Sequence, residues 1–96
     1  MPAFLIATLT VTDPGKFSTY ARDVPAQVAA YGGTYVARGG AIEVLEGDEA
    51  VDRVVVIRFD SKADAERYYH SPEYTVLRGV RAGAAHGLLV ITETLE

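Results

Sequence analysis

The sequence predicts a ferredoxin-like α+β sandwich, in which helices cover one face of an antiparallel sheet. Segments of strand and helix character follow one another in the order β-α-β-β-α-β, which is the element order of this fold. The 96-residue chain has 49% hydrophobic and 23% charged residues, an ordinary globular composition. A chain of this length has room for one hydrophobic core, so residues 1–96 are expected to form a single domain.

The first strand is expected at residues 4–11, FLIATLTV, because this segment is rich in β-forming residues and too short for a buried helix. A helix then begins with Thr12 or Asp13 as its cap and Pro14 at its first position. Apolar residues at helical spacing extend the helix to about residue 31, where a glycine pair stops it. Pro25 predicts a kink in this helix or a restart at Asp23.

Residues 34–46 are predicted to form one long strand that is deflected at Gly39-Gly40. The segments TYVAR and AIEVLEG both have strand composition, and a glycine pair within a strand often marks a bulge or a bend. The same glycine pair is also a good two-residue hairpin turn, which would divide the segment into two strands. After the polar turn DEAVD, the next strand is expected at residues 53–60, RVVVIRFD.

The second helical region is expected in two pieces. DSKADAERYYH begins with Asp60 or Ser61 as its cap, and SPEYTVLRGVRAGA begins again with Ser71 as its cap and a proline at the first helical position. This capping role accounts for Ser71, and the adjacent histidine is not expected to activate it as a nucleophile. The last strand is expected at residues 88–95, LLVITETL.

Both faces of the predicted sheet are apolar. In the first strand Phe4 and Ile6 alternate with Leu5 and Ala7, and the two later strands repeat this pattern. Two helices cover only one face, and a bare apolar face would exceed the patch size that soluble monomers tolerate. We therefore expect a homodimer closed sheet against sheet. The alternative is that the broken second helix wraps round and covers more of the sheet.

Composition excludes several classes of function. The net charge is −4 and the nine Lys and Arg residues are spread along the chain, so nucleic acid is not an expected partner. The absence of cysteine excludes disulfides and thiolate sites and fits a cytoplasmic location. No run approaches the ~20 apolar residues of a membrane span. His70 and His86 lack a metal-ligand spacing, and no cofactor is expected.

Four motifs in order, YGGTYVARGG, EVLEG, VVVIRFDS and YYHSPEYTVLR, resemble the bacterial family of domain of unknown function 1330. The similarity spans residues 4–95 and includes DPGKFSTY, which is similar to the Asp-Pro-x-x-aromatic-x-x-Tyr start of the family's first helix. Arg58 departs from the family, which commonly has an acidic residue there. The resemblance implies a ferredoxin-like fold paired into a dimeric α/β barrel. It implies no reaction, because relatives in the barrel superfamily include cofactor-independent monooxygenases, isomerases, haem enzymes and ligand-binding proteins.

Arg38 is the first candidate site residue. An arginine beside flexible glycines can direct its planar guanidinium at a carboxylate or another oxyanion. The structural interpretation is that it pairs with Glu43 or Glu46 and fixes the bend. Glu46 is in turn a candidate general base, although a glutamate in a turn is more often simply solvated.

The six tyrosines are the second unusual feature, since the chain has no tryptophan. Tyr20, Tyr31, Tyr35 and Tyr74 all lie near predicted element junctions. Each one is commonly a packing residue with a satisfied hydroxyl. Together they are also suited to line a pocket for an aromatic or enolic ligand, because phenolic hydroxyls donate hydrogen bonds to its oxygens.

Arg58 and Glu93 are charged residues inside otherwise apolar strands. Buried charges are usually paired. A salt bridge across the dimer interface is the structural interpretation, and a polar floor beneath a ligand cavity is the functional one.

These observations favour a homodimer with one small cavity per subunit, which binds a small organic acid or an aromatic metabolite. Arg38 would be the anion anchor. The expected walls are Tyr20, Tyr35 and Tyr74. The enzyme hypothesis adds proton transfer, as in an isomerase or a cofactor-free oxygenase, with Glu46 or His70 as the base. The alternatives are a non-catalytic ligand-sensing module and a structural dimerisation domain.

Overall fold

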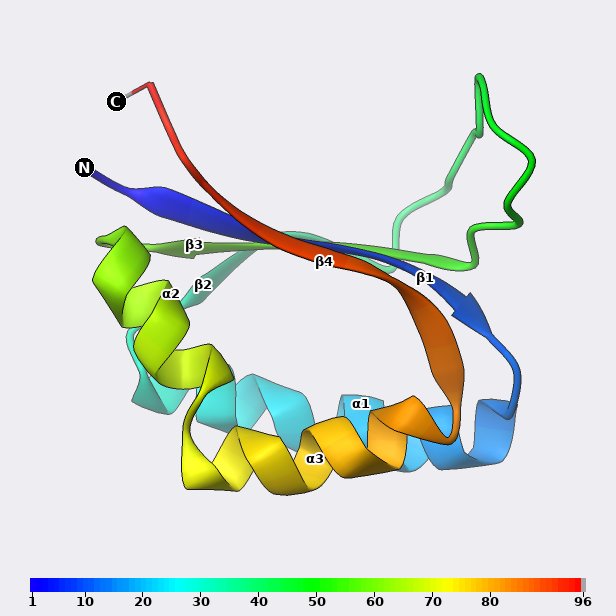
Figure 1. Ribbon diagram of the computed structural model, residues 1–96, viewed down its shortest axis with the longest axis horizontal. Helices are drawn as coiled ribbons and strands as arrows, with labels where there is room; N and C mark the ends of the chain where they lie inside the picture. The colour runs from blue at the N-terminus through cyan, green and yellow to red at the C-terminus, as the bar shows by residue number, and fades with distance from the viewer. Residues whose placement is uncertain (96) are drawn as a thin grey trace.

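The computed structural model, which describes residues 1–95, contains a four-stranded antiparallel sheet with three helices on one face (Figure 1). The strand order is β2-β3-β1-β4, and all neighbouring strands are antiparallel. The predicted ferredoxin-like fold is therefore confirmed. The elements in chain order are β1 (Ala3–Val11), α1 (Pro14–Ala30), β2 (Thr34–Arg38), β3 (Arg53–Phe59), α2 (Lys62–Tyr69), α3 (Pro72–Ala82) and β4 (Ala85–Glu93).

Side-chain caps start all three helices. The carboxylate of Asp13 accepts a hydrogen bond from the backbone N–H of Lys16, and the hydroxyls of Ser61 and Ser71 accept equivalent bonds in α2 and α3. Each cap satisfies a backbone donor that the first helical turn leaves without a partner. Pro25 lies inside α1, which continues past it to Ala30 as one helix. No restart of this helix occurs at the proline.

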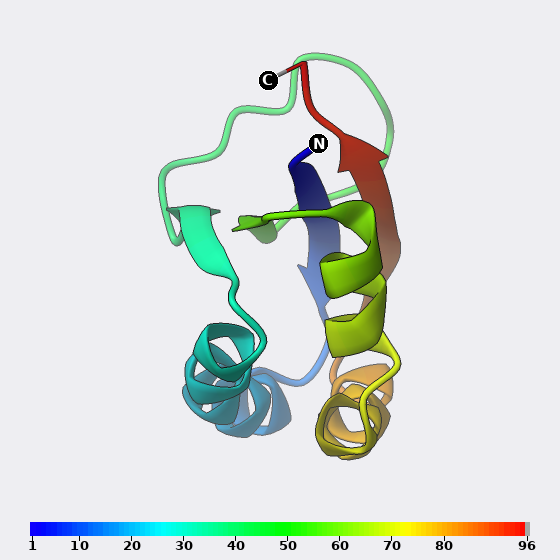
Figure 2. The same cartoon turned by 90° about the vertical axis from the view of Figure 1, so that its left-hand side faces the viewer.

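One hydrophobic core fills the space between the sheet and the helices. Figure 2 shows α1 below the β2 edge and α2 with α3 below the β4 edge. The inward side chains of β1 alternate with outward ones, as expected for a strand with one covered face. The core includes Leu5, Ala7, Leu9, Tyr20, Val24, Val28, Ile57, Phe59, Tyr68, Tyr74 and Leu77.

β2 contains a β-bulge. Its register against β3 shifts by one residue between Tyr35 and Ala37, so Val36 is an extra residue with no partner in the ladder. Successive side chains in a strand face opposite sides, and two residues three positions apart would normally face apart. The extra residue reverses this relation. Tyr35 and Arg38 therefore both face the helices, opposite core-facing positions of β3.

The predicted strand over residues 34–46 is wrong beyond Arg38. Residues 39–52 form an exposed loop that rises on the side of the sheet away from the helices (Figure 1). Gly39 has a φ of +75°, a left-handed conformation that turns the chain out of the sheet. It makes neither a bulge nor a hairpin turn. β3 begins only at Arg53, and the backbone of AIEVLEG pairs with none of the strands in residues 1–95.

The outer face of the sheet, formed by Phe4, Ile6, Val54, Val56, Leu88 and Val90, is not covered by any helix of residues 1–95. Leu88 is 62% exposed and Val90 is 40% exposed. The helices α2 and α3 lie on the same face as α1, so the second helical region does not wrap round the sheet (Figure 2). None of the helices in residues 1–95 has the length and apolar character that a membrane span requires.

Candidate functional site

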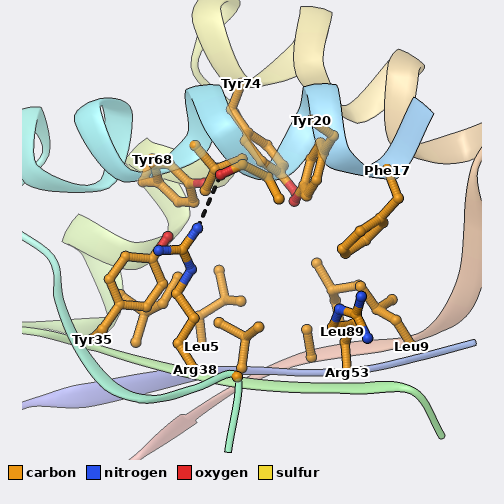
Figure 3. Close-up of a pocket in the computed structure, with 16 residues that line it drawn as sticks. Leu5, Leu9, Phe17, Tyr20, Tyr35, Arg38, Arg53, Tyr68, Tyr74 and Leu89 are labelled. Carbon is orange, nitrogen blue, oxygen red and sulfur yellow. Dashed lines mark hydrogen bonds between the residues drawn. The ribbon is translucent and has the colours of Figure 1, made fainter. Parts of the chain in front are cut away.

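A cavity of about 350 Å³ lies between the sheet and the helices. This volume is in the range of small-molecule sites. Exposed residues at the ends of β2 and β3 contribute to its lining, which places its opening there. Figure 3 shows the polar side chains around it. The apolar part of the lining consists of Leu5, Ala7, Leu9, Phe17, Ala21, Val24, Val55, Ile57 and Leu89.

Three buried tyrosines form the helix side of the cavity. The hydroxyls of Tyr20 and Tyr74 lie 2.7 Å apart and share a hydrogen bond, and Arg81 donates a bond of 3.1 Å to the Tyr74 hydroxyl. The ring of Tyr68 lies 4.8 Å from that of Tyr74, centroid to centroid. Burial raises the pKa of all three phenols above the ordinary value. The hydroxyls are therefore protonated near neutral pH.

Arg38 lies on the sheet side of the cavity, at the end of β2. Its guanidinium packs over the ring of Tyr35 at 5.0 Å from the centroid, and its Nη2 donates a hydrogen bond of 3.0 Å to the backbone carbonyl of Ala21 in α1 (Figure 3). The residue four positions after Ala21 is Pro25, which has no N–H to offer this carbonyl. Arg38 thus supplies the donor that the proline removes. The guanidinium carries further N–H donors besides the one that this bond uses.

Arg53, at the start of β3, is a second arginine on the sheet side of the cavity, at the end away from Arg38 (Figure 3). Its guanidinium lies 5.4 Å from the ring centroid of Phe17 and donates a 2.8 Å hydrogen bond to the carbonyl of Asp52. Among the described residues, no Asp, Glu or His side chain lines the cavity. The two arginines therefore make it electropositive, and an anionic ligand group is favoured there.

The structure brings four of the predicted site residues together. Arg38, Tyr20, Tyr35 and Tyr74 all line the cavity. The bulge in β2 explains why two of them, on one short strand, face the same way. The hydrogen bond between Tyr20 and Tyr74 joins residues 54 positions apart, so it depends on the packing of α1 against α3.

The two predicted bases lie elsewhere. Glu46 is in the exposed loop 39–52, because the chain leaves the sheet at Gly39. His70 is the exposed C-cap of α2, where its ring contacts Tyr69 edge-on. Neither residue lines the cavity. Arg38 makes no ion pair with Glu43 or Glu46 within residues 1–95, since its bonding partner is a backbone carbonyl.

Sequence reasoning missed Arg53 and Tyr68. Arg53 shares its strand face with two core residues of β3, so strand alternation places it inward. Tyr68 follows the buried Ala65 by one helical turn, and this spacing distinguishes it from the adjacent Tyr69. Both signals were present in the pattern of the sequence. They became informative only once the covered face of each element was known.

The remaining candidates have structural roles. Tyr31 donates a 2.7 Å hydrogen bond to the carboxylate of Glu73 on the surface of α3. The Ser71 hydroxyl donates to the Tyr68 carbonyl at 2.7 Å and caps α3, as predicted. No cluster of His, Cys, Asp and Glu suited to a metal ion occurs within the described chain.

Arg58 and Glu93 lie on opposite faces of the sheet. Arg58 is opposite Phe4 of the outer face, where it contacts Asp60 at 3.4 Å, and Glu93 is opposite the inward-facing Ala3. The two charges therefore do not pair within one chain. Neither contributes to the lining of the cavity, so they do not form its floor.

Chemically, the cavity offers hydrogen-bond donors and positive charge in an apolar enclosure. It is suited to bind an oxyanion or to polarise a carbonyl oxygen. Abstraction of a proton would require a base from outside the lining residues.

Solved structures share this fold at low sequence identity. The RPA0582 protein of unknown function from Rhodopseudomonas palustris aligns with a TM-score of 0.82 and 20% identity, covering 99% of this chain and 83% of that one. SnoaB, a cofactor-independent oxygenase from Streptomyces nogalater, aligns with a TM-score of 0.73 and 14% identity over 99% and 94% of the two chains. A dimeric ferredoxin-like protein of unknown function from Thermobifida fusca aligns with a TM-score of 0.72 and 19% identity, covering 98% of this chain and 92% of that one.

Comparison with curated protein sequences gave no match. The family model described as domain of unknown function DUF1330 matches residues 2–95. This match covers nearly the whole chain and confirms the resemblance found in the sequence motifs. The protein is thus a member of the DUF1330 family.

Proposed function

We propose that this protein binds a small, largely apolar organic acid, of about the size of a bicyclic aromatic compound, in the cavity between sheet and helices. The observation that carries the proposal is the composition of the lining. Two arginines and four tyrosines are set into an otherwise apolar wall, with no acidic side chain among the described lining residues. The apolar part favours the body of such a ligand, and the arginines favour its carboxylate.

The expected affinity is modest. A bicyclic acid such as 2-naphthoate has about 13 non-hydrogen atoms, and drug-sized ligands gain roughly 0.3 kcal/mol per atom. The resulting ~4 kcal/mol corresponds to a dissociation constant of about 1 mM. A natural ligand that uses both arginines and the hydroxyls should bind more tightly. The first experiment therefore has to detect weak binding.

The test is titration of the ¹⁵N-labelled protein by NMR with 2-naphthoate and with its uncharged analogue 2-naphthylmethanol. The acid should bind at least tenfold more tightly, and its advantage should fall about tenfold in Arg38→Ala or Arg53→Ala. Arg22→Ala is the matched control, because Arg22 is an exposed arginine of α1 that pairs with Asp23 outside the cavity. Equal affinities for the two compounds, or the same loss in all three variants, would contradict the proposal.

Catalysis of proton transfer is the second candidate function. The tyrosine hydroxyls are able to stabilise an enolate oxygen, and the fold is shared by SnoaB, a cofactor-independent oxygenase. Glu46 or His70 would have to approach the cavity to act as base. The test is exchange of the C1 protons of 2-tetralone in D₂O, which protein should accelerate and Glu46→Gln or His70→Asn should slow. Exchange at the rate of buffer alone would leave binding as the only function proposed.

We also propose that two copies pair through the outer faces of their sheets. The uncovered apolar residues of this face support the pairing, and the Thermobifida fusca protein with the same fold is dimeric. Sedimentation equilibrium should give twice the chain mass for the wild type and one chain mass for Val90→Asp. Thr19→Asp, on the exposed surface of α1, is the control. A monomeric wild type at micromolar concentration would refute the pairing.

A further inference from the structure

Two phenolic hydrogens in the tyrosine wall of the cavity have no hydrogen-bond acceptor among residues 1–95. Tyr20, Tyr68 and Tyr74 each carry one phenolic hydrogen. The mutual bond of Tyr20 and Tyr74 uses one of these hydrogens. Arg81, which also bonds to Tyr74, has only donors and accepts none. The Tyr68 hydroxyl forms no hydrogen bond within residues 1–95, so two of the three hydrogens lack a protein acceptor.

This count does not depend on which way the central bond runs. If Tyr74 donates to Tyr20, the Tyr20 hydrogen is left over, and if Tyr20 donates, the Tyr74 hydrogen is left over. Arg81 favours the first arrangement, because a hydroxyl that already accepts a bond from a guanidinium becomes a stronger donor. In both arrangements the pair presents one free O–H. Tyr68, whose ring packs against that of Tyr74, presents another.

The two free O–H groups belong to side chains that line the cavity. The tyrosines extend from the helices, whereas Arg38 and Arg53 extend from the strands on the other side (Figure 3). Burial holds the phenols in their protonated form, so they act as donors at physiological pH. A buried donor that is left without an acceptor is costly, and water satisfies it only while no ligand takes its place.

We infer that the ligand presents an acceptor-only oxygen, a carbonyl, to Tyr20, Tyr68 and Tyr74. This inference rests on the proposed binding of an acid and extends it. With its carboxylate at the arginines and a carbonyl at the hydroxyls, the ligand belongs to the class of aromatic or alicyclic keto acids. A ligand that offers only donors at this end, such as an ammonium group, would leave both phenolic hydrogens without an acceptor and is disfavoured.

The experiment compares 1-indanone with indane by NMR titration in the wild type and in Tyr→Phe variants. Both probes are uncharged, so the ratio of their dissociation constants isolates the carbonyl from the arginines. The hydrogen count predicts an unusual pattern. Tyr20→Phe and Tyr74→Phe each leave one free O–H in the pair, so each single variant should keep the ketone preference within about threefold.

The double variant Tyr20→Phe with Tyr74→Phe removes the pair's free hydrogen, and Tyr68→Phe removes the other. Each should lower the preference for the ketone about tenfold, and the triple variant should abolish it. Tyr31→Phe is the matched control, because Tyr31 bonds to Glu73 outside the cavity and should change nothing. Amide spectra establish that each variant is folded, and either the double variant or Tyr68→Phe alone suffices for the test.

The outcomes separate this inference from the proposed function. If 2-naphthoate binds with the expected dependence on Arg38 but no tyrosine variant changes the ketone preference, the acid site stands and the carbonyl inference is overturned. A loss in Tyr20→Phe as large as in the double variant would overturn the hydrogen count itself. If 2-naphthoate, 1-indanone and indane all fail to shift the resonances of cavity residues, both proposals fail.

Discussion

Replacing Pro25 by alanine should make Arg38 less important for stability. The carbonyl of Ala21 lacks its usual helical donor because Pro25 has no N–H, and Arg38 supplies a bond of 3.0 Å instead. In Pro25→Ala the helix donates to this carbonyl itself. The guanidinium then keeps only its contact with the ring of Tyr35.

The magnitudes follow from these two contacts. In the wild type, Arg38→Ala removes a partly exposed hydrogen bond, worth about 1 kcal/mol, and a cation–π contact, worth about 0.5 kcal/mol at an exposed site. The expected loss in unfolding free energy is about 1.5 kcal/mol. In the Pro25→Ala background only the contact with the ring is lost, about 0.5 kcal/mol. Pro25→Ala alone should stabilise, since an interior proline costs up to ~3 kcal/mol relative to alanine.

Urea unfolding of the four proteins in this double-mutant cycle measures the coupling, which should be about 1 kcal/mol. A second cycle with Pro14→Ala is the control, because Pro14 occupies the first position of α1 and deprives no carbonyl of a donor. Independent sites add within about 0.5 kcal/mol. Coupling no larger than this, or equal coupling in both cycles, would show that Arg38 does not replace the missing helical donor.

Three further predictions concern the tyrosines, the bulge and a glycine. Burial raises the pKa values of the Tyr20 and Tyr74 phenols above about 10, so at high pH the folded state retains protons that the unfolded state loses. The free energy of unfolding should therefore fall above about pH 10, by up to ~1.4 kcal/mol per pH unit for each phenol. The fall measured by urea unfolding should be shallower in Tyr20→Phe/Tyr74→Phe, and an unchanged slope would disprove the assignment. Deletion of Val36 removes the extra residue of β2 and leaves Arg38 facing the cavity. The affinity for 2-naphthoate, measured by NMR, should therefore change less than threefold. A tenfold loss would contradict the register of β2 against β3. Gly87→Ala places a Cβ 2.0 Å from a backbone oxygen of β1 and should lower the free energy of unfolding in urea by more than ~3 kcal/mol. The control is Gly79→Ala in α3, where a Cβ meets no neighbouring atom and should not destabilise the protein. Equal changes in unfolding free energy for the two variants would refute the clash.

Local chemistry made the order of the elements and the helix starts predictable. A cap is a contact between residues three positions apart, so Ser71 could be recognised from the sequence alone, and the cap of α2 could be narrowed to Asp60 or Ser61. The alternation of apolar residues likewise predicted that one sheet face would be left uncovered. These features depend on neighbours along the chain and not on the distant parts of the fold.

Strand pairing was less predictable, because it depends on a partner strand. AIEVLEG has strand composition but pairs with no strand among the described residues, and it forms part of a loop. The bulge at Val36 has no glycine or proline to mark it, and only the register against β3 reveals it. The placement of Glu46 near Arg38 assumed a continuous strand, so it failed together with that strand.

The composition of the site was predicted in part for a related reason. Arg38 was predicted from the glycine pair that follows it, and Tyr20, Tyr35 and Tyr74 from their positions near element junctions. Arg53 and Tyr68 have no such mark in the sequence. Arg38 is positioned by its hydrogen bond to the carbonyl of Ala21, which lacks a helical donor because Pro25 has no N–H. A contact between β2 and α1 of this kind has no signature in either segment alone.

The most direct measurement is a crystal structure of the protein with 2-naphthoate. We predict a bicyclic ring in the cavity between the sheet and α1, with its carboxylate within hydrogen-bond distance of Arg38 or Arg53. The Tyr20 and Tyr74 side chains should keep their mutual bond. A ligand bound only on the outer face of the sheet, or a cavity closed by the side chains that line it, would show that this cavity is not a binding site.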